Sequence, residues 1–336
     1  MERTICFRLL HTLESEGFLR QAKLRKYTSN LHILSGKQFR IGYASVGYNS
    51  FSAAVGHGLR LAARERQLDV IEFENKYSPK MALHNVELLV KERVDLAIEL
   101  QVFDRIAGKV STLFQEAGIP LIALDVPHPG ATFFGVDNRK VAETISRKLL
   151  RAAQEAWSGE FDELILLFAE SLGPVPSLRL SHAEAVLRKG CQGDWLTTRL
   201  DTRGEFIRSF DMTRKHLQLV PKRRTLLSGS NDPSVLGALR AFEESGRGAL
   251  CRAVGVGGTA EARSEVRKPN TRLVGTVGCF PENYGDRVLA VALDILQHKS
   301  VPPAIYTPIK LITPQNLDEF YPKEIFERAE MDETQI

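Results

Sequence analysis

The sequence has few cysteines, and their placement excludes the usual cysteine-based sites. The 336-residue chain contains four of them, Cys6, Cys191, Cys251 and Cys279. No two form a CxxC pair, and none has a histidine partner at metal-ligand spacing, so the pattern predicts neither a metal site nor a redox motif. Scattered single thiols are typical of structural residues in a reducing cytoplasm.

The sequence also lacks the apolar segments that direct a chain to a membrane. No stretch approaches the roughly 18 consecutive apolar residues that a membrane-spanning helix needs. The opening residues, MERTICFRLLHTLESEGFLR, interleave charged and apolar side chains and contain no small-residue cleavage site, which is not the pattern of a signal peptide. These absences favour a cytoplasmic protein with no membrane partner.

Motifs for catalysis and for cofactor binding are missing as well. There is no nucleophile elbow, no paired-acid motif and no cluster of metal ligands. The segment 255–260, GVGGTA, formally fits the dinucleotide signature GxGxxA. No acidic residue ends the next predicted strand, RLVGTVGCF, where a ribose-binding carboxylate is needed. We therefore expect a protein that is not an enzyme and has no cofactor.

What the chain does contain is a regular alternation of strands and helices. Forty-three per cent of its residues are apolar, which is enough for a substantial core. Short apolar runs alternate with amphipathic stretches of ten or more residues, and this alternation predicts βαβ units with parallel sheets. The strands are too many for one sheet of usual size, so an α/β fold with two doubly wound lobes is expected. The predicted strands are 39–45, 69–74, 94–100, 119–125, 163–170, 195–201, 224–230, 251–258, 272–280 and 304–312.

Positive charge is concentrated at the N-terminus. Residues 1–40 contain eight Lys and Arg against three acidic residues, a net charge of +5, whereas the whole chain carries +4. A basic end on a nearly neutral body suggests a nucleic-acid contact confined to that end, and a merely solvated basic tail is the alternative.

The same segment has a helical pattern followed by a basic turn. Cys6, Leu9, Leu10 and Leu13 share one helical face, and Gly17 ends the predicted helix. The arrangement resembles the second half of the winged helix-turn-helix in isocitrate-lyase-regulator-type repressors, although the two helices that normally come first are missing. The resemblance implies DNA contacts from the helix and from the wing, by Arg3, Thr4, Arg8 and His11 and by Lys23, Arg25 and Lys26 respectively.

The segment SGSNDPSVLGALRAFEESGR, residues 228–247, shows how one predicted strand passes into a helix. Asp232 is expected to be the helix N-cap, and Pro233 suits the first helical position. Capping leaves Asn231 without a role. It stands at the carboxyl end of a parallel strand, where open α/β sheets bind ligands.

This segment, together with LIALDVPH, FFGVDN and the late VGTVG strand, resembles the type I periplasmic-binding fold over about residues 38–325. The fold is shared by sugar-binding proteins and by the effector domains of lactose-repressor-type regulators. The resemblance implies two Rossmann-like doubly wound lobes joined by three crossover strands, near 136–139, 277–280 and 305–308. We expect a partial winged helix at 1–37 and a ligand-binding domain at 38–330, with lobe 1 at 38–138 and 280–305 and lobe 2 at 139–279 and 306–330.

The resemblance also implies a ligand site between the lobes. The expected contacts are Tyr48, Asn49, Phe51, Asp125, Arg179, Asn231 and Cys279. A loop-stabilising amide is the alternative for Asn231, and a core residue is the alternative for Phe51. The chain departs from ribose-type binders at three points, with Val126 in place of an arginine, Gly255–Gly258 in place of a turn that carries a carboxylate, and Cys279 in place of a glutamine. These departures favour a less polar or differently substituted ligand than ribose.

Two functions follow from these patterns. The first is a cytoplasmic, ligand-sensing transcriptional regulator, a homodimeric repressor that binds DNA and a small molecule, most simply a carbohydrate. The alternative is a solute-binding protein of a sugar ABC-type transporter. We expect the first, because the basic N-terminal segment fits it and a leader peptide is lacking.

Overall fold

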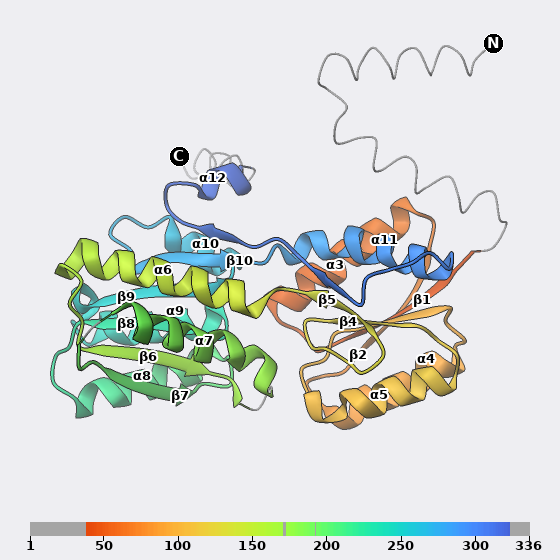
Figure 1. Ribbon diagram of the computed structural model, residues 1–336, viewed down its shortest axis with the longest axis horizontal. Helices are drawn as coiled ribbons and strands as arrows, with labels where there is room; N and C mark the ends of the chain where they lie inside the picture. The colour runs from red at the N-terminus through yellow and green to blue at the C-terminus, as the bar shows by residue number, and fades with distance from the viewer. Residues whose placement is uncertain (1–37, 171–172, 192, 323–336) are drawn as a thin grey trace, which may run out of the picture.

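The computed structural model describes residues 38–170, 173–191 and 193–322. They form two lobes that lie side by side, each with a central sheet covered by helices on both faces (Figure 1). The predicted winged helix and its DNA-contacting residues lie outside the described residues. No helix in the described ranges is long and apolar enough to cross a bilayer.

Lobe 1 is built on a six-stranded parallel sheet in the order β11-β5-β4-β3-β1-β2. Helices α3 and α11 cover one face of this sheet, and α4 and α5 cover the other (Figure 1). The strands are β1 (Arg40–Ser45), β2 (Asp69–Glu74), β3 (Leu96–Glu99), β4 (Leu121–Leu124), β5 (Thr132–Gly135) and β11 (Ala304–Tyr306), and the helices are α3 (Ser50–Glu65), α4 (Pro79–Lys91), α5 (Asp104–Glu116) and α11 (Tyr284–Leu296).

Lobe 2 repeats this plan with the order β12-β10-β9-β8-β6-β7. Its strands are parallel except β12, which runs antiparallel to β10 at the edge. The strands are β6 (Glu163–Phe168), β7 (Leu196–Asp201), β8 (Thr225–Gly229), β9 (Cys251–Gly257), β10 (Leu273–Gly278) and β12 (Lys310–Ile312), and the helices are α6 (Asn138–Trp157), α7 (Pro174–Gly190), α8 (Phe206–Leu219), α9 (Asp232–Glu244), α10 (Ala260–Val266) and α12 (Leu317–Phe320).

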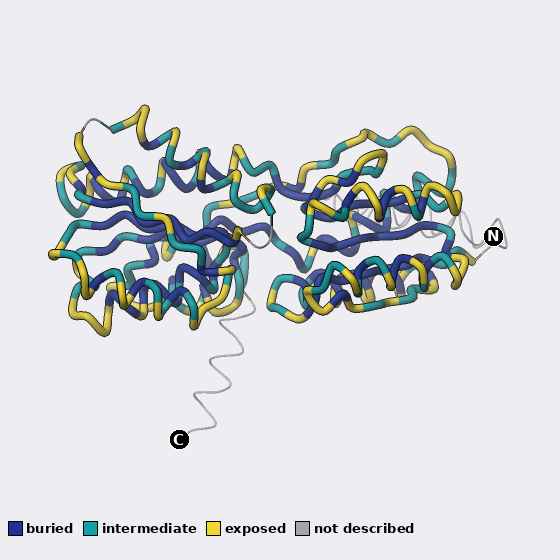
Figure 2. Tube along the Cα trace, turned by 90° about the horizontal axis from the view of Figure 1, so that it is seen from below, coloured by how far each residue is buried: buried dark blue, intermediate teal, exposed yellow. Residues whose placement is uncertain are grey.

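The central strands are apolar along their whole length because helices cover both sides of each sheet. Every residue of β3, β4, β6 and β8 is buried, as expected for parallel strands inside an α/β layer structure. Figure 2 shows these buried strands between helices whose outer sides are exposed. The alternation in the sequence therefore predicted the layers correctly.

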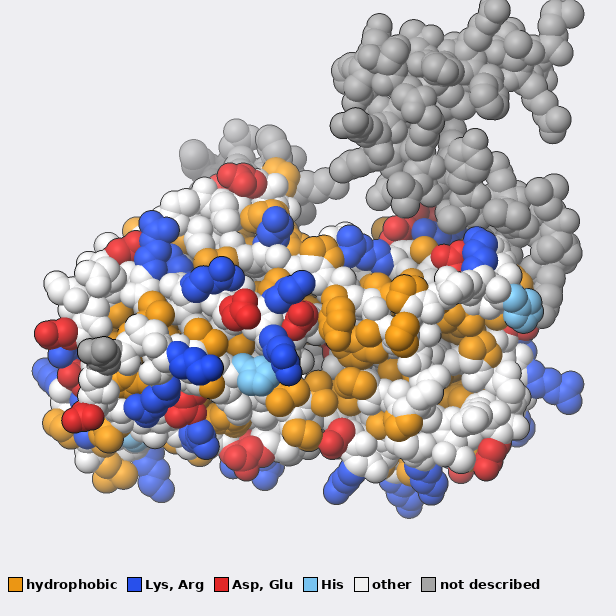
Figure 3. Space-filling view, in the orientation of Figure 1, with side chains coloured by type: hydrophobic (Ala, Val, Ile, Leu, Met, Phe, Trp, Pro, Cys, Tyr) orange, Lys and Arg blue, Asp and Glu red, His pale blue; other side chains and the backbone are white. Residues whose placement is uncertain are grey.

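The surface shown in Figure 3 carries both signs of charge, most densely over lobe 2. Hydrophobic side chains gather on the part of lobe 1 that borders lobe 2. Tyr306, at the end of the edge strand β11, is 58% exposed and packs on Phe133 with ring centroids 5.7 Å apart. Apolar exposure on this face is thus concentrated next to the junction of the lobes.

The chain crosses between the lobes three times within the described residues. It passes from β5 to α6, from β10 to α11 and from β11 to β12. This arrangement confirms the predicted fold class, two Rossmann-like lobes joined by three crossover segments. Its consequence is that the carboxyl ends of the parallel strands of both sheets meet at the junction, where such sheets bind ligands.

Candidate ligand-binding cavity

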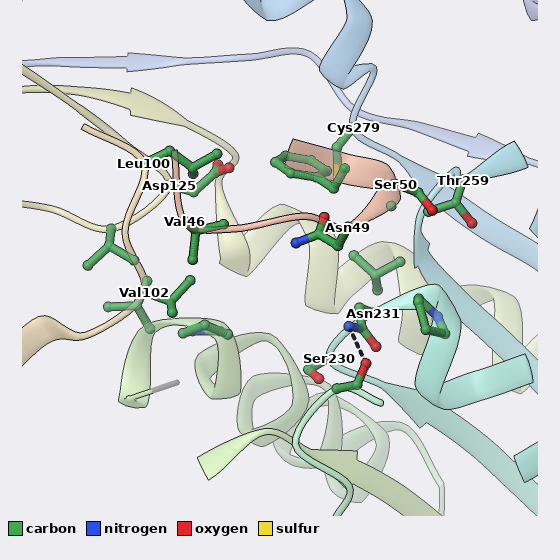
Figure 4. A pocket seen from close by; sticks show the side chains of 18 of the residues that line it. Val46, Asn49, Ser50, Leu100, Val102, Asp125, Ser230, Asn231, Thr259 and Cys279 are labelled. Carbon is green, nitrogen blue, oxygen red and sulfur yellow. Dashed lines mark hydrogen bonds between the residues drawn. The ribbon is translucent and has the colours of Figure 1, made fainter. Parts of the chain in front are cut away.

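A cavity of about 610 Å³ lies between the lobes. Lobe 1 contributes the segments that follow β1, β3 and β4, and lobe 2 contributes those that follow β8 and β9 together with the start of α7 (Figure 4). The cavity is within the size range of small-molecule sites. All seven residues predicted as ligand contacts line it, namely Tyr48, Asn49, Phe51, Asp125, Arg179, Asn231 and Cys279. The structure thus brings them together, while their contact with a ligand stays a prediction.

Asn231, and not Asp232, caps helix α9. Its Oδ1 accepts a hydrogen bond from the Ser234 amide at 3.1 Å, and its Nδ2 donates to the Gly204 carbonyl at 2.9 Å. The prediction that Asp232 is the N-cap is wrong, because the cap position needs an extended backbone, which Asn231 has, and Asp232 is already helical. Of the two amide hydrogens of Asn231, the Gly204 carbonyl occupies one, so the second can serve a ligand.

Asp232 instead holds lobe 2 together beneath the cavity. Its side chain is buried and accepts hydrogen bonds from the Thr276 hydroxyl at 2.6 Å and from the Thr259 amide at 2.8 Å. Burial raises the pKa of Asp232, and these hydrogen bonds act in the opposite direction. A Cβ on Gly255 would lie 2.2 Å from the Asp232 carboxylate, so only glycine fits there. Asp232 therefore joins the start of α9 to β10 and to the loop before α10.

Asn49 has the same kind of position in lobe 1. It caps α3 in a capping box. Its Oδ1 accepts a hydrogen bond from the backbone N–H of Ser52 at 2.8 Å, and the backbone N–H of Asn49 donates to the Ser52 hydroxyl at 3.1 Å. The Asn49 Nδ2 also donates to the Tyr77 hydroxyl. Asn49 and Asn231 thus face the cavity from opposite lobes, each held in place by its helix (Figure 4).

Asp125 is the carboxylate of lobe 1 in the cavity. It follows β4 with a left-handed backbone, φ 58°, and its Oδ1 accepts a hydrogen bond from the Tyr284 hydroxyl at 3.2 Å. Burial raises the pKa of Asp125 to about 6, while the positive charge of Arg179 and the hydrogen bond from Tyr284 act to lower it. At neutral pH Asp125 is therefore an anionic acceptor at the cavity wall.

Arg179 reaches the cavity from α7 in lobe 2. Its Nε donates to the Asn138 side chain at 3.0 Å, and its Nη1 donates to the Ser230 carbonyl at 3.2 Å. These two bonds fix the guanidinium between the start of α6 and the end of β8. The Ser230 hydroxyl is buried and has no hydrogen-bond partner within the described part of the chain. A buried hydroxyl without a partner is rare in folded proteins. Because Ser230 lines the cavity, a bound ligand can supply the missing hydrogen bond.

The remaining predicted residues form apolar and aromatic surface. Phe51 is partly buried and meets the Tyr284 ring edge to face, with centroids 5.7 Å apart. It packs against the cores of both lobes, so Phe51 is a core residue, as the alternative interpretation predicted, and it also lines the cavity. Tyr48 is 85% exposed at the rim. Burial raises the pKa of the Cys279 thiol to about 12, which makes it an apolar wall residue and not a nucleophile.

Sequence reasoning missed several lining residues, among them Tyr77, Gln101, Phe103, Thr259 and Tyr284. The first four follow strands β2, β3 or β9, so the rule that ligands bind at strand ends could have found them. Tyr284 could not be found that way. It enters lobe 1 from the second crossover, far from Asp125 in the sequence, and only the folded chain brings the two together.

A family model described as "Periplasmic binding protein domain" matches residues 43–300. The ribose import binding protein RbsB of Bacillus subtilis is 26% identical over 292 residues, which is 82% of this chain and 88% of that protein. Among solved structures, an ABC transporter solute-binding protein from Bacillus halodurans with bound myo-inositol has a TM-score of 0.73 at 18% identity, covering 84% of this chain and 97% of that chain. A periplasmic one from Actinobacillus succinogenes with bound D-allose has a TM-score of 0.72 at 18% identity, covering 83% and 98%.

These relatives contradict the regulator prediction. They are an import binding protein and ABC transporter solute-binding proteins, one of them described as periplasmic. The prediction of a cytoplasmic, DNA-binding repressor is therefore wrong, and the predicted DNA and homodimer partners have no support from them. The error has a physical cause. Both branches of the family share the same two-lobed fold, so the choice depended only on the N-terminal residues, on their basic charge and on the leader peptide that was not found in them. The relatives are binding proteins and not enzymes, in agreement with the sequence.

Proposed function

The chain belongs to the periplasmic binding protein domain family, and we propose that it is the solute-binding component of an ABC-type importer for a sugar or polyol. One observation carries the proposal: charged and amide side chains from both lobes converge on one cavity between them. Asp125 and Asn49 come from lobe 1, and Arg179 and Asn231 come from lobe 2. The names of the relatives, with ribose, myo-inositol and D-allose as ligands, support the ligand class.

The chemistry of these groups suits hydroxyl groups. Asp125 accepts hydrogen bonds, Arg179 donates them, and Asn231 has one amide hydrogen that Gly204 does not use. Hydrogen bonds to charged groups are stronger than neutral ones, and they are worth about 1.5–3 kcal/mol each. Phe51 and Tyr48 offer ring surface to the apolar C–H face of a sugar. All seven predicted residues are therefore proposed as the ligand-binding set.

We propose that the two lobes act as separate bodies that close on the ligand. We keep the predicted division, 38–138 and 280–305 for lobe 1 and 139–279 and 306–330 for lobe 2, except that Asn138 goes with α6 in lobe 2 and Tyr306 goes with β11 in lobe 1; residues 323–330 lie outside the described residues. A ligand that touches both lobes binds the closed arrangement better than an open one and shifts the equilibrium by that difference. The closed form with its ligand is then what the membrane permease of the importer recognises.

Calorimetric titration tests the proposal. D-Ribose, D-allose and myo-inositol are titrated into the protein, and at least one of them, or a close analogue, should bind. Asp125→Ala and Asn231→Ala should each weaken that binding by about 1–3 kcal/mol, the range for removing one hydrogen-bonding partner from a buried site. Glu116→Ala, on the exposed side of α5, serves as the control and should bind normally. Equal affinity in the wild type and in all three variants would show that Asp125 and Asn231 do not bind the ligand.

A further inference from the structure

We infer that the ligand is a methyl-bearing sugar or polyol, such as a 6-deoxyhexose or an O-methyl inositol, and not a fully hydroxylated one. The inference rests on the proposed function and names the ligand class of the same cavity. It is carried by the apolar wall at one end of that cavity, which we call the aliphatic wall and define as Val46, Leu100, Val102 and Val126.

The aliphatic wall is a property of three neighbouring strand ends in lobe 1. Val46 follows β1, Leu100 and Val102 follow β3, and Val126 follows β4. Val46, Leu100 and Val126 are at most 4% exposed. Figure 4 places Val46, Leu100 and Val102 together at one end of the cavity with Asp125 beside Leu100, and Ser50 and Thr259 at the other end. The first end, the aliphatic end, therefore consists of aliphatic side chains around a single labelled carboxylate, and the other end, the polar end, carries hydroxyl groups.

Lobe 2 closes the aliphatic end with further apolar groups. Val175 and Pro176 at the start of α7 line the same cavity. A Cβ on the preceding Gly173 would lie 2.8 Å from the Asp104 carboxylate and 3.5 Å from the Val102 carbonyl oxygen, so this turn of lobe 2 lies directly against the β3 loop of lobe 1. Val175 and Pro176 thus add apolar surface from lobe 2 to the same cavity.

The polar residue inside this wall has its side chain engaged elsewhere. Gln101 Nε2 lies 3.1 Å from His128 Nε2, and Gln101 Oε1 accepts a hydrogen bond from the Phe103 amide. His128 Nδ1 lies 2.9 Å from the Val126 carbonyl. These contacts join the β3 and β4 loops and fix the buried Gln101 side chain, with one of its two amide hydrogens directed at His128. A ligand group at this end meets aliphatic carbon from the side chains of the wall.

A buried hydroxyl against this wall would lose its hydrogen bonds to water without replacement, whereas a methyl group would gain burial. A hydrophobic pocket discriminates by about 10- to 200-fold for one methyl-sized group. The preference for the methyl-bearing ligand should therefore be about tenfold or more.

Matched pairs of sugars test the inference by calorimetric titration of the full chain. The pairs are L-rhamnose with L-mannose, L-fucose with L-galactose, and D-pinitol with D-chiro-inositol. In at least one pair the methyl-bearing member should bind about tenfold or more tightly. Val102→Thr, which replaces a methyl group of the wall by a hydroxyl, should lower that ratio severalfold. Val110→Thr is the control, since it makes the same change at a buried site in α5 outside the cavity, and it should leave the ratio unchanged.

The outcomes separate the two proposals. If a hydroxylated member binds as tightly as or more tightly than its methyl-bearing partner in every pair that binds, the inference is overturned and the proposed function stands. If neither these six compounds nor D-ribose, D-allose and myo-inositol bind, both fall. A ratio that Val102→Thr leaves unchanged also overturns the inference, because the aliphatic wall would then not be the source of the preference.

Discussion

Glu99 places a carboxyl group in the interior of lobe 1 with no exposed surface. One of its oxygens accepts a hydrogen bond from Asn75 at 2.9 Å, and Asn75 accepts one in turn from Asn85 at 2.8 Å. The other oxygen, Oε2, has no partner among the described residues. Burial raises the pKa of Glu99 to about 8, against the opposing effect of the Asn75 hydrogen bond. The folded protein therefore holds a proton on Glu99 that the unfolded chain releases near its ordinary value of 4.5.

This difference predicts a pH-dependent stability. Because the folded pKa lies above the unfolded one, the contribution of Glu99 is fully present below about pH 4.5 and is lost as pH rises through about 8. Within that window the contribution of Glu99 to the free energy of unfolding falls by about 1.4 kcal/mol for each pH unit. Glu99→Gln, which stays neutral, should flatten the fall in melting temperature between pH 5 and pH 8. Scanning calorimetry at both values measures it, with the exposed Glu116→Gln as the control. An equally steep fall in Glu99→Gln would contradict the assignment.

The residues of the site show where sequence reasoning succeeds and where it stops. The strand-end rule predicted the position of Asn231, because parallel strands deliver the residues that follow them to one edge, whereas Asn49 and Asp125 were predicted from the family resemblance. The N-cap was assigned to the wrong residue of the Asn231-Asp232 pair, since the cap position is set by a backbone dihedral that the residue types alone do not fix. The pairing of Asp125 with Tyr284 depends on a crossover that no local pattern encodes.

At the scale of elements, the packing of α3 on α11 depends on two glycines. A Cβ on Gly285 would lie 2.1 Å from the Gly58 carbonyl carbon, and one on Gly58 would lie 2.5 Å from the Glu282 carbonyl oxygen. The two helices therefore meet backbone to backbone. The helical periodicity predicted both helices but not this contact, because it records which face is apolar and not how closely another backbone approaches.

The close contact predicts opposite effects for two glycine-to-alanine changes. Gly285→Ala should destabilise the protein by at least about 1–3 kcal/mol, the usual cost of overpacking, since backbone atoms cannot give way as a side chain does. Gly108→Ala lies in α5 with nothing within 4 Å of the added carbon, and it should stabilise by about 0.5–1 kcal/mol. Thermal unfolding of both variants checks the pair. A Gly285→Ala protein as stable as the wild type would show that the helices are not in backbone contact.

For the molecule as a whole, the lobes already touch at both ends of the cavity. At the polar end the Ser50 hydroxyl donates to Glu261 of lobe 2 at 3.2 Å. At the aliphatic end a Cβ on Gly173 would lie 2.8 Å from the Asp104 carboxylate of lobe 1. A two-lobed architecture was predictable from the number and spacing of strands. The branch of the family was not, because the lobes of its members share one fold and one pattern.

These end contacts predict how the molecule responds to its ligand. Each is a single polar or surface contact, and an exposed polar contact contributes little, so the lobes should separate readily without a ligand. A sugar held by Asp125 on one side and Asn231 on the other adds hydrogen bonds that exist only when the lobes are closed. Small-angle scattering should therefore give a smaller radius of gyration at saturation with a sugar that binds in the calorimetric titrations. Asp125→Ala, which lacks the lobe 1 acceptor, should need more ligand to reach the same curve. Identical wild-type curves with and without saturating ligand would mean that the lobes do not move, and binding would then have to occur in a preformed cavity.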